Sequence, residues 1–314
     1  KKDIDAGKYG NYTNYSEPIK RLKMHRALAV FRGEKEEILT VGIGIDDQVI
    51  LQKLKKHFLK GYGTTQNIII EAIEDSFKRL IHPSLENETL KKIREKADKE
   101  AIKLFAGNLK QLLMAPPTGE KRIMAIDPGY RTGCKVVCLD EQGNLLHNET
   151  IFPHAPQKET KKAIKKIQSL TDAYRPDYIA IGNGTASKET ERFIKKIKFT
   201  KDVEVFMVNE DGASVYSASK TAREEFPQYD VTVRGAVSIG RRLLDPLAEL
   251  IKIDPKSIGV GQYQHDVNQT QLKKELDETV FQCVNEVGVN LNTASYHLLA
   301  YVSGLSETQA KNIV

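Results

Sequence analysis

The chain has 314 residues, of which 40% are hydrophobic and 29% charged, with a net charge of +6. This is enough apolar material for about two domains of ordinary size. We expect neither a membrane nor a secreted protein, because no run reaches the roughly 18 apolar residues of a membrane span and no signal peptide opens the chain. The three cysteines form no CxxC pair, so they predict neither disulfides nor a structural zinc site and fit a reducing cytoplasm.

The positive charge is unevenly distributed. Residues 151–200 hold 11 basic against 5 acidic side chains, whereas residues 201–314 hold 11 against 16. A local basic excess favours polyanion partners such as RNA or DNA. The chain opens at Lys1 without a methionine and stops at Val314 inside a helical pattern, so we expect a fragment.

Residues 1–117 are predicted to form a helical module. Apolar residues recur every three or four positions, the spacing of a helix face. The pair His82-Pro83 is expected to end one helix, and Leu90–Met114 to form one long charged helix. Two consecutive prolines, Pro116 and Pro117, cannot continue that helix and predict a domain boundary.

Residues 118–251 are predicted to form an α/β domain with a mixed sheet. The expected strands are Arg122–Ile126, Cys134–Leu139, Leu145–Phe152, Tyr178–Ile181 and Val203–Val208. The expected helices are Lys158–Ala173, Ser187–Lys198, one from Ala213, and Val233–Ile251 with a break at Pro246. Three successive strands followed by alternating helices and strands are typical of the ribonuclease H and resolvase class, and less so of a doubly wound parallel sheet.

Residues 252–314 are predicted to be helical. A helix over Gln271–Val287 precedes two short helices joined at Gly304, the order of a helix-hairpin-helix motif that the end of the chain truncates. The backbone N–H groups of such a turn bind phosphates without reading bases, so little positive charge is needed. An αα-hairpin packed on its neighbour is the other interpretation. His265 has no second His or Cys at ligand spacing, so we do not predict it to bind metal.

Three acids are candidates for a site that cleaves phosphodiesters. Asp127 ends the first strand, Glu210 follows the fifth, and Asp245 lies on the closing helix. Two-metal cleavage needs several carboxylates around ions about 3.5–4 Å apart. The tip of the fourth strand supplies only the neutral Asn183, so we expect a reduced site in which Asp127 and Glu210 are the candidate ligands and Mg²⁺ the candidate ion. A tight turn at Pro128 and a helix cap at Asp245 are the plainer interpretations.

Two further features point toward phosphate. The loop Gly182–Ser187 precedes a helix and either presents N–H groups to a phosphate or simply caps that helix through Thr185 or Ser187. Lysines spaced by three and four residues, Lys161 and Lys165 on one helix and Lys195 on the next, predict a track for a nucleic-acid backbone. A solvated charged face is the alternative.

Five motifs in order resemble the Tex family of bacterial transcription accessory proteins. These motifs are Asp127–Gly133, Gly182–Ser187, Ala213–Ser219, Arg234–Ile239 and Val260–Val267. The resemblance extends from His25–Gly33 to Val289–Ser295 and so covers nearly the whole chain. It implies a YqgF domain related to RuvC resolvases and ribonuclease H. Helical modules precede that domain in the family, and helix-hairpin-helix motifs and an OB-fold RNA-binding domain follow it. We expect the chain to be a fragment that does not include the OB-fold domain.

The resemblance also implies a nucleic-acid-binding factor linked to transcription. Asp127 matches the first-strand acid of the resolvases and Glu210 fits the last-strand acid. Asn183 stands where a glutamate is expected, and Asp245 is assigned to the closing helix by position alone. The resemblance therefore implies a binding scaffold whose resolvase-like site is reduced.

We expect binding of RNA or DNA without sequence specificity and without a required cofactor. Lys161, Lys165, Lys195 and the turn at Gly304 would hold phosphates. One alternative is a nuclease that depends on magnesium or manganese and uses Asp127, Glu210 and Asp245. The other is an adaptor that binds RNA polymerase or the ribosome through the helical module.

Overall fold

The structure is a computed structural model that describes residues 7–60, 63, 65–289, 291 and 294–314. The chain divides into two compact units. The first comprises Lys1–Leu104 and Gln262–Gln271, and the second Phe105–Gly261 and Leu272–Val314. None of the helices among the described residues is long and apolar enough to cross a membrane.

The first unit is helical, as the apolar spacing predicts. Its elements are η1 (Gly7–Tyr12), η2 (Ile19–Arg21), α1 (Met24–Lys35), α2 (Asp47–Phe58), α3 (Thr65–Ser76), η3 (Phe77–Ile81) and the part of α4 (His82–Leu113) up to Leu104. Buried residues of α4 recur every four positions, at Ile93, Ala97 and Ala101, and form one apolar stripe. The Arg94 guanidinium beside that stripe lies 4.6 Å from the centre of the Phe31 ring of α1.

One expectation for this unit is wrong, because His82-Pro83 does not end the helix. The chain passes through a π-helical turn at η3 and continues directly as α4. Pro83 falls in the first turn of α4. The missing N–H of a proline costs little there, because that N–H has no partner within its own helix.

The second unit contains a five-stranded mixed sheet, which confirms the predicted class. Its strands are β1 (Ile123–Asp127), β2 (Cys134–Leu139), β3 (Leu145–Ile151), β4 (Tyr178–Gly182) and β5 (Glu204–Val208). They lie in the order β3-β2-β1-β4-β5. The first three strands form an antiparallel meander, and β4 and β5 add in parallel beside β1. The carboxyl ends of β1, β4 and β5 therefore meet at one edge of the sheet.

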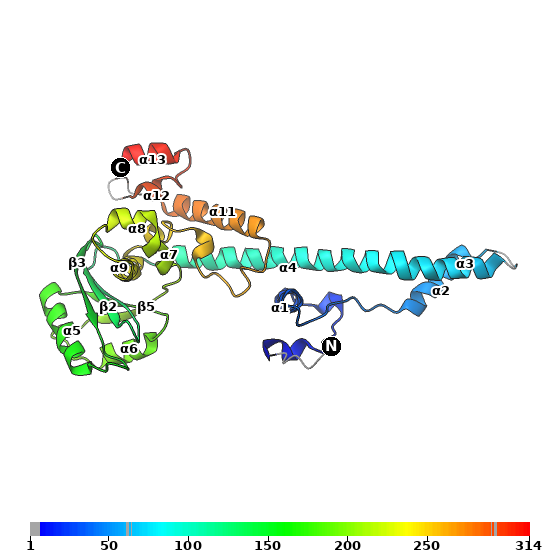
Figure 1. Cartoon of the computed structure of the whole chain (residues 1–314). Helices are drawn as coiled ribbons and strands as arrows, with labels where there is room; N and C mark the ends of the chain where they lie inside the picture. The colour runs from blue at the N-terminus through cyan, green and yellow to red at the C-terminus, as the bar shows by residue number, and fades with distance from the viewer. Residues whose placement is uncertain (1–6, 61–62, 64, 290, 292–293) are drawn as a thin grey trace. The chain divides into compact units, whose positions relative to one another are not determined.

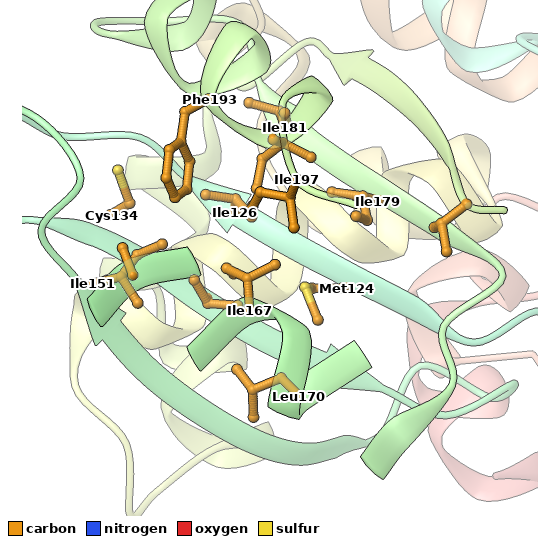
Figure 2. Packing of buried hydrophobic residues seen from close by; sticks show 14 of the residues in the cluster. Met124, Ile126, Cys134, Ile151, Ile167, Leu170, Ile179, Ile181, Phe193 and Ile197 are labelled. Carbon is orange, nitrogen blue, oxygen red and sulfur yellow. The ribbon is translucent and has the colours of Figure 1, made fainter. Parts of the chain in front are cut away.

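Both faces of the sheet are buried, so alternate residues of β1 enter two different cores. Met124 and Ile126 pack beneath α5 (Thr160–Tyr174) and α6 (Ser187–Lys195), as Figure 2 shows. Ile123 and Ala125 face the other core, which contains Ala236 and Ile239 of α9 (Val231–Leu244). Because side chains alternate along a strand, Asp127 lies on the α9 face.

Short helices complete this part of the unit (Figure 1). These are α7 (Ala213–Ala218), α8 (Lys220–Glu225), α10 (Pro246–Leu250) and η4 (Pro255–Ser257). The predicted break at Pro246 is confirmed, because α9 ends at Leu244 and α10 begins at Pro246. Gly240 allows α9 to approach the sheet closely, since a Cβ there would meet Leu139 Cδ1 at 2.6 Å and Ala125 Cβ at 2.9 Å.

The C-terminal part contains α11 (Gln269–Val287), α12 (Tyr296–Leu299) and α13 (Glu307–Ile313). Asn285 of α11 anchors the turn between the two short helices. Its Nδ2 donates to Tyr301 O at 2.9 Å, and its Oδ1 accepts from Ser303 N at 3.0 Å. Residues 290, 292 and 293 of the predicted C-terminal motif lie outside the described residues.

Candidate functional site

The site is built around Asp127, the last residue of β1. The alternation that buries Ile123 and Ala125 directs Asp127 toward α9, where it faces Gly235. A Cβ on Gly235 would stand 3.8 Å from Asp127 Oδ2. The helix that closes over the end of β1 therefore presents no side chain at this position beside the acid.

Glu210 joins Asp127 at this edge, as predicted from its place after β5. Its carboxylate lies over two glycines at the end of β4, and a Cβ on either Gly182 or Gly184 would overlap it. The backbone of Gly184 is close enough to that carboxylate to oppose the rise in its pKa, and Glu210 Oε2 is buried without a hydrogen-bond partner among the described residues. Asn183 acts on the backbone instead, because its Oδ1 accepts from Glu210 N at 3.1 Å.

Burial disfavours the charged form of both acids. It raises the pKa of Asp127 to about 6, with the nearby charge of Glu210 adding to the effect and Lys135 opposing it. Burial also raises the pKa of Glu210, against the effect of the Gly184 backbone. Both shifts follow from removing carboxylates from water and placing like charges together.

The two acids line one cavity of about 260 Å³. Its polar lining otherwise comes from the hydroxyls of Ser214, Ser217 and Thr232, and the last two are already engaged. Ser217 Oγ donates to Ser214 O at 2.8 Å, and Thr232 Oγ1 donates to Asp230 Oδ1 at 2.7 Å. The chemistry that the cavity offers is therefore that of two carboxyl groups which can accept or hold a proton.

Asp245 does not lie with this pair, contrary to its predicted place. Its Oδ1 accepts from Ala248 N at 2.9 Å, so it caps α10, and it lines a different cavity. Ten residues separate it from Gly235, about 15 Å along a helix. Pro246 explains the difference, because it ends α9 and makes Asp245 the cap of the next helix.

These residues do not fit a two-metal centre. Among the described residues, no three His, Cys, Asp or Glu side chains come together as a metal site. Asp127 and Glu210 supply two carboxylates, and the oxygen of Asn183 already accepts a backbone hydrogen bond. A magnesium ion held by the two acids stays a prediction, and we derive no chemical step through it.

The loop Gly182–Ser187 does not cap α6 in the way that the sequence predicted, and its binding of a phosphate stays a prediction. Ala186 stands at the N-cap of α6 with a φ of +63°, and neither Thr185 nor Ser187 caps the helix through its side chain. The Glu210 carboxylate packs closely against Gly184, on the backbone that a phosphate would approach. The loop therefore serves to hold the acid.

The three predicted lysines are exposed, but they do not form one row. Lys161 lies in the first turn of α5, and Lys195 lies in the last turn of α6, where it pairs with Glu191 at 2.6 Å. Both helices begin at the edge of the sheet that carries Asp127. The last residue of β3 pairs with the first residue of β2 at this edge, where β1 also ends, and β4 runs parallel to β1 and ends there too. Lys161 and Lys165 are thus near this edge, whereas Lys195 is remote from it.

Gly304 lies in the turn between α12 and α13 with a φ of +87°. It is exposed, and a Cβ there would meet nothing within 4 Å. No hydrogen bond in the described part of the chain uses the Gly304 N–H. The positive φ is the reason for glycine at this turn.

Several residues that position the site were not predicted as functional. Gly184 and Gly235 surround the acids, and Arg242 of α9 donates to both Asn209 O and Asp211 O at 2.8 Å, which holds the loop around Glu210. Gly184 and Gly235 lie within the conspicuous motifs at Gly182–Ser187 and Arg234–Ile239. The glycines of these motifs were a usable signal, but which atoms they approach required the fold.

Family models match most of the chain. The model described as Tex protein YqgF-like domain matches residues 121–244, and Tex central region-like matches residues 1–105. A Helix-hairpin-helix motif model matches residues 284–314. A solved structure of T. thermophilus RuvC in complex with a Holliday junction substrate aligns with 39% of this chain and 91% of its own, at 16% identity and a TM-score of 0.29, a likeness too small to carry an argument.

Longer curated proteins are similar over the whole chain. "Uncharacterized protein YdcI" of Bacillus subtilis is 51% identical over 98% of this chain and 43% of its own length. "Transcriptional accessory protein Tex" of Neisseria gonorrhoeae is 43% identical over 100% of this chain and 42% of its own. The human "S1 RNA-binding domain-containing protein 1" is 40% identical over 100% of this chain and 32% of its own. The chain thus spans less than half the length of these relatives.

The strand order and the acid at the end of β1 define residues 121–244 as a ribonuclease H-like domain of the YqgF type. Tex models match both this domain and residues 1–105, and a helix-hairpin-helix motif model matches the end of the chain. The chain therefore belongs to the Tex family.

Proposed function

We propose that this chain binds RNA or DNA without reading base sequence, as part of a transcription accessory factor. The main support for this proposal is the hairpin turn at Gly304. Its exposed N–H has no partner among the described residues, and Asn285 anchors the adjoining backbone through hydrogen bonds of 2.9 and 3.0 Å. A fixed turn with a free donor suits a phosphate and carries no base information.

The basic face of α5 supports the same proposal. Lys161 and Lys165 are one helical turn apart, and neither takes part in an ion pair among the described residues. Their neighbours differ, because Lys162 pairs with Glu159 at 3.1 Å and Lys166 with Glu149 at 2.7 Å. Unpaired exposed lysines release counterions when they meet a phosphate backbone, whereas paired ones must first lose their partner.

The lysines provide a matched test of this function. We would measure the binding of labelled single-stranded RNA and DNA by fluorescence anisotropy at several salt concentrations. Lys161→Gln with Lys165→Gln should weaken binding and lower the salt slope by about 1 to 2. Lys162→Gln with Lys166→Gln is the control with the same change in charge, and its effect should be smaller. Equal slopes in the parent chain and both variants would refute the role of α5.

The hairpin is tested separately through its glycine. Gly304→Val should weaken binding because a β-branched residue cannot adopt the φ of +87° without strain. Gly119→Val is the matched control, since Gly119 has a φ of +71° and equally open surroundings but lies outside the hairpin. If both variants bind like the parent chain, the turn is not a phosphate site.

A second candidate function is that of a protein adaptor, in which the first unit binds RNA polymerase or the ribosome. Large apolar side chains are exposed on α2, α3 and η3, among them Phe58 at 58%, Ile68 at 69% and Leu80 at 55%. Exposed apolar side chains that lie together on a surface mark contact sites, so these residues are the ones to test. Purified polymerase treated with nuclease should then bind the parent chain but not Ile68→Glu, with Asn67→Glu as the control.

The metal-dependent nuclease gains no support from the geometry. Its predicted third ligand, Asp245, caps α10 instead of joining Asp127 and Glu210. Binding as proposed needs no cofactor. The same gel that reports retardation of a labelled strand reports its cleavage with Mg²⁺ or Mn²⁺, and cleavage that Asp127→Ala abolishes would establish the nuclease.

A further inference from the structure

The loop between β1 and β2 projects an aromatic and a cationic side chain from the edge that carries Asp127. Tyr130 is 39% exposed, and Arg131 is exposed beside it. Arg131 takes part in no ion pair in the described part of the chain. A planar ring next to an unpaired cation is the combination that proteins use to bind single-stranded nucleic acid without sequence preference.

The backbone of this loop is fixed at successive carbonyls. Arg131 O accepts from Gln157 Nε2 at 3.2 Å, and Lys135 Nζ donates to Thr132 O. Gly133 closes the loop with a φ of +76°, and a Cβ there would meet Phe152 Cε1 at 2.7 Å. Because this backbone is already ordered, the loop loses little conformational entropy when a ligand binds to its side chains.

The ring of Tyr130 also has a neighbour that helps to hold it in place. His154 makes a T-shaped contact with it at a centroid distance of 6.0 Å and an interplanar angle of 69°. Partial burial raises the pKa of Tyr130, and the nearby charge of Glu189 adds to the rise. His154 is positioned in turn by Thr190, with 2.8 Å between Nε2 and Oγ1. A T-shaped contact covers at most one face of the tyrosine ring, so it leaves a face on which a base can stack.

The surrounding charges favour a phosphate beside Arg131 more than beside the Tyr130 hydroxyl. Gln157, which binds the Arg131 carbonyl, lies three residues before the start of α5, whose first turn carries the exposed Lys161. Glu189, at the far end of the ring, repels a phosphate there. A strand would therefore place its backbone on the side of Arg131 and α5 and its base on the ring.

We propose that Tyr130 stacks on an unpaired base of single-stranded RNA or DNA while Arg131 contacts a neighbouring phosphate. This inference rests on the proposed function and assigns it a site in the YqgF-like domain, in addition to the hairpin. Stacking needs an unstacked base, so the site selects single strands over duplexes. It reads no sequence, because every base has a π-face.

The composition of the chain allows a direct test, because it contains no tryptophan. Tyr130→Trp makes residue 130 the sole indole, whose fluorescence is quenched when a base stacks on it. Leu146→Trp is the control. Leu146 is 45% exposed and lies at the start of β3, which pairs with the end of β2 at the opposite end of the sheet from Asp127.

Both variants are titrated with unlabelled single-stranded U₂₀ and dT₂₀ and with a 20-base-pair duplex, while anisotropy of a labelled strand reports total binding. Quenching by the single strands in Tyr130→Trp, and not in Leu146→Trp, is expected. Tyr130→Ala should weaken single-strand binding about 5- to 100-fold, and Tyr130→Phe should retain it. Arg131→Gln should lower the salt slope by about 1.

The outcomes separate this site from the function on which it rests. Anisotropy that reports binding while residue 130 is not quenched would refute the Tyr130 site and leave nucleic-acid binding in place. Quenching by the duplex as strong as by the single strands would refute base stacking. Absence of binding in the parent chain at low salt would overturn both proposals.

Discussion

Asp127 at the end of β1 faces Gly235 of α9, and a Cβ on that glycine would stand 3.8 Å from Asp127 Oδ2. That is an ordinary van der Waals distance, so the position has room for a larger residue. The helix that closes over the acid pair thus lacks a carboxylate where one could reach Asp127. This relationship explains why the described residues do not form a three-ligand metal site.

Gly235→Asp should create such a site. A third carboxylate beside Asp127 and Glu210 completes the kind of oxygen-rich set that Mg²⁺ and Mn²⁺ bind. We expect Mn²⁺ affinity at least about tenfold above that of the parent chain, measured by isothermal titration calorimetry. Gly235→Asn is the neutral control and should gain much less. Equal Mn²⁺ affinity in the parent and Gly235→Asp would show that Gly235 does not limit metal binding.

Asp127→Asn should make the protein more stable at neutral pH. The folded-state pKa of Asp127 is raised to about 6, above its ordinary value of 3.8, so the unfolded chain releases this proton more readily. The stability that protonated Asp127 contributes is full below about pH 4 and is lost as the pH rises through 6. Urea unfolding should show a gain for Asp127→Asn on the order of 1–3 kcal/mol at pH 7.5 and little difference at pH 4.

Gly184→Ala should destabilise the second unit. A methyl group there overlaps the buried Glu210 carboxylate and forces it to move. We expect a loss of about 1–3 kcal/mol in the free energy of unfolding, the usual cost of overpacking. Gly107→Ala in α4 is the control, because nothing lies within 4 Å of its Cβ position and alanine favours a helix. A neutral Gly184→Ala would contradict the close approach.

Glu225 is the anion at the centre of a partly buried charge cluster. It accepts from the Tyr216 hydroxyl at 2.8 Å and pairs with Lys252 at 3.0 Å and with Arg241. Burial alone would raise the pKa of Glu225, but the two cations outweigh it and keep the pKa below its ordinary value.

Glu225→Ala leaves those cations without their shared partner, which should cost about 3 kcal/mol of unfolding free energy. Glu224→Ala removes a neighbouring acid that is paired only at the surface, with Lys220 at 3.4 Å, and should change stability by less than about 1 kcal/mol. Thermal unfolding of the two variants at one pH compares them directly. Similar melting temperatures would show that the cluster contributes little.

Much of the fold could be predicted from local patterns. The order of elements in the second unit follows from three local signals. These are the period-two strands, the glycine-containing turn before β3 and the two prolines after α4. The predicted helix end at Pro83 was wrong because a proline is tolerated in the first turn of a helix as well as after its end. The alternation along β1 even assigns Asp127 to a face, once the faces are known.

The candidate site could be predicted only in part. Asp127 and Glu210 each follow a strand, and parallel strands that share an edge bring such residues together. The predicted place of Asp245 beside the other two acids was wrong. Its position depends on where α9 ends relative to the sheet, and no local sequence pattern determines that. Tyr130 and Arg131 lay in a recognised motif, but their exposure depends on the chain segments that cover the rest of the loop.

What the sequence by itself determined is the class of sheet, the acid at the end of its first strand and the break at Pro246. These follow from side-chain periodicity and backbone chemistry, which act over a few residues. Only the tertiary structure decided that Glu210 lies over Gly184, that Gly235 faces Asp127 and that Asp245 caps a helix elsewhere. These relationships join residues up to about a hundred positions apart, and they are set by how closely α9 and the loops after β4 and β5 pack on the sheet.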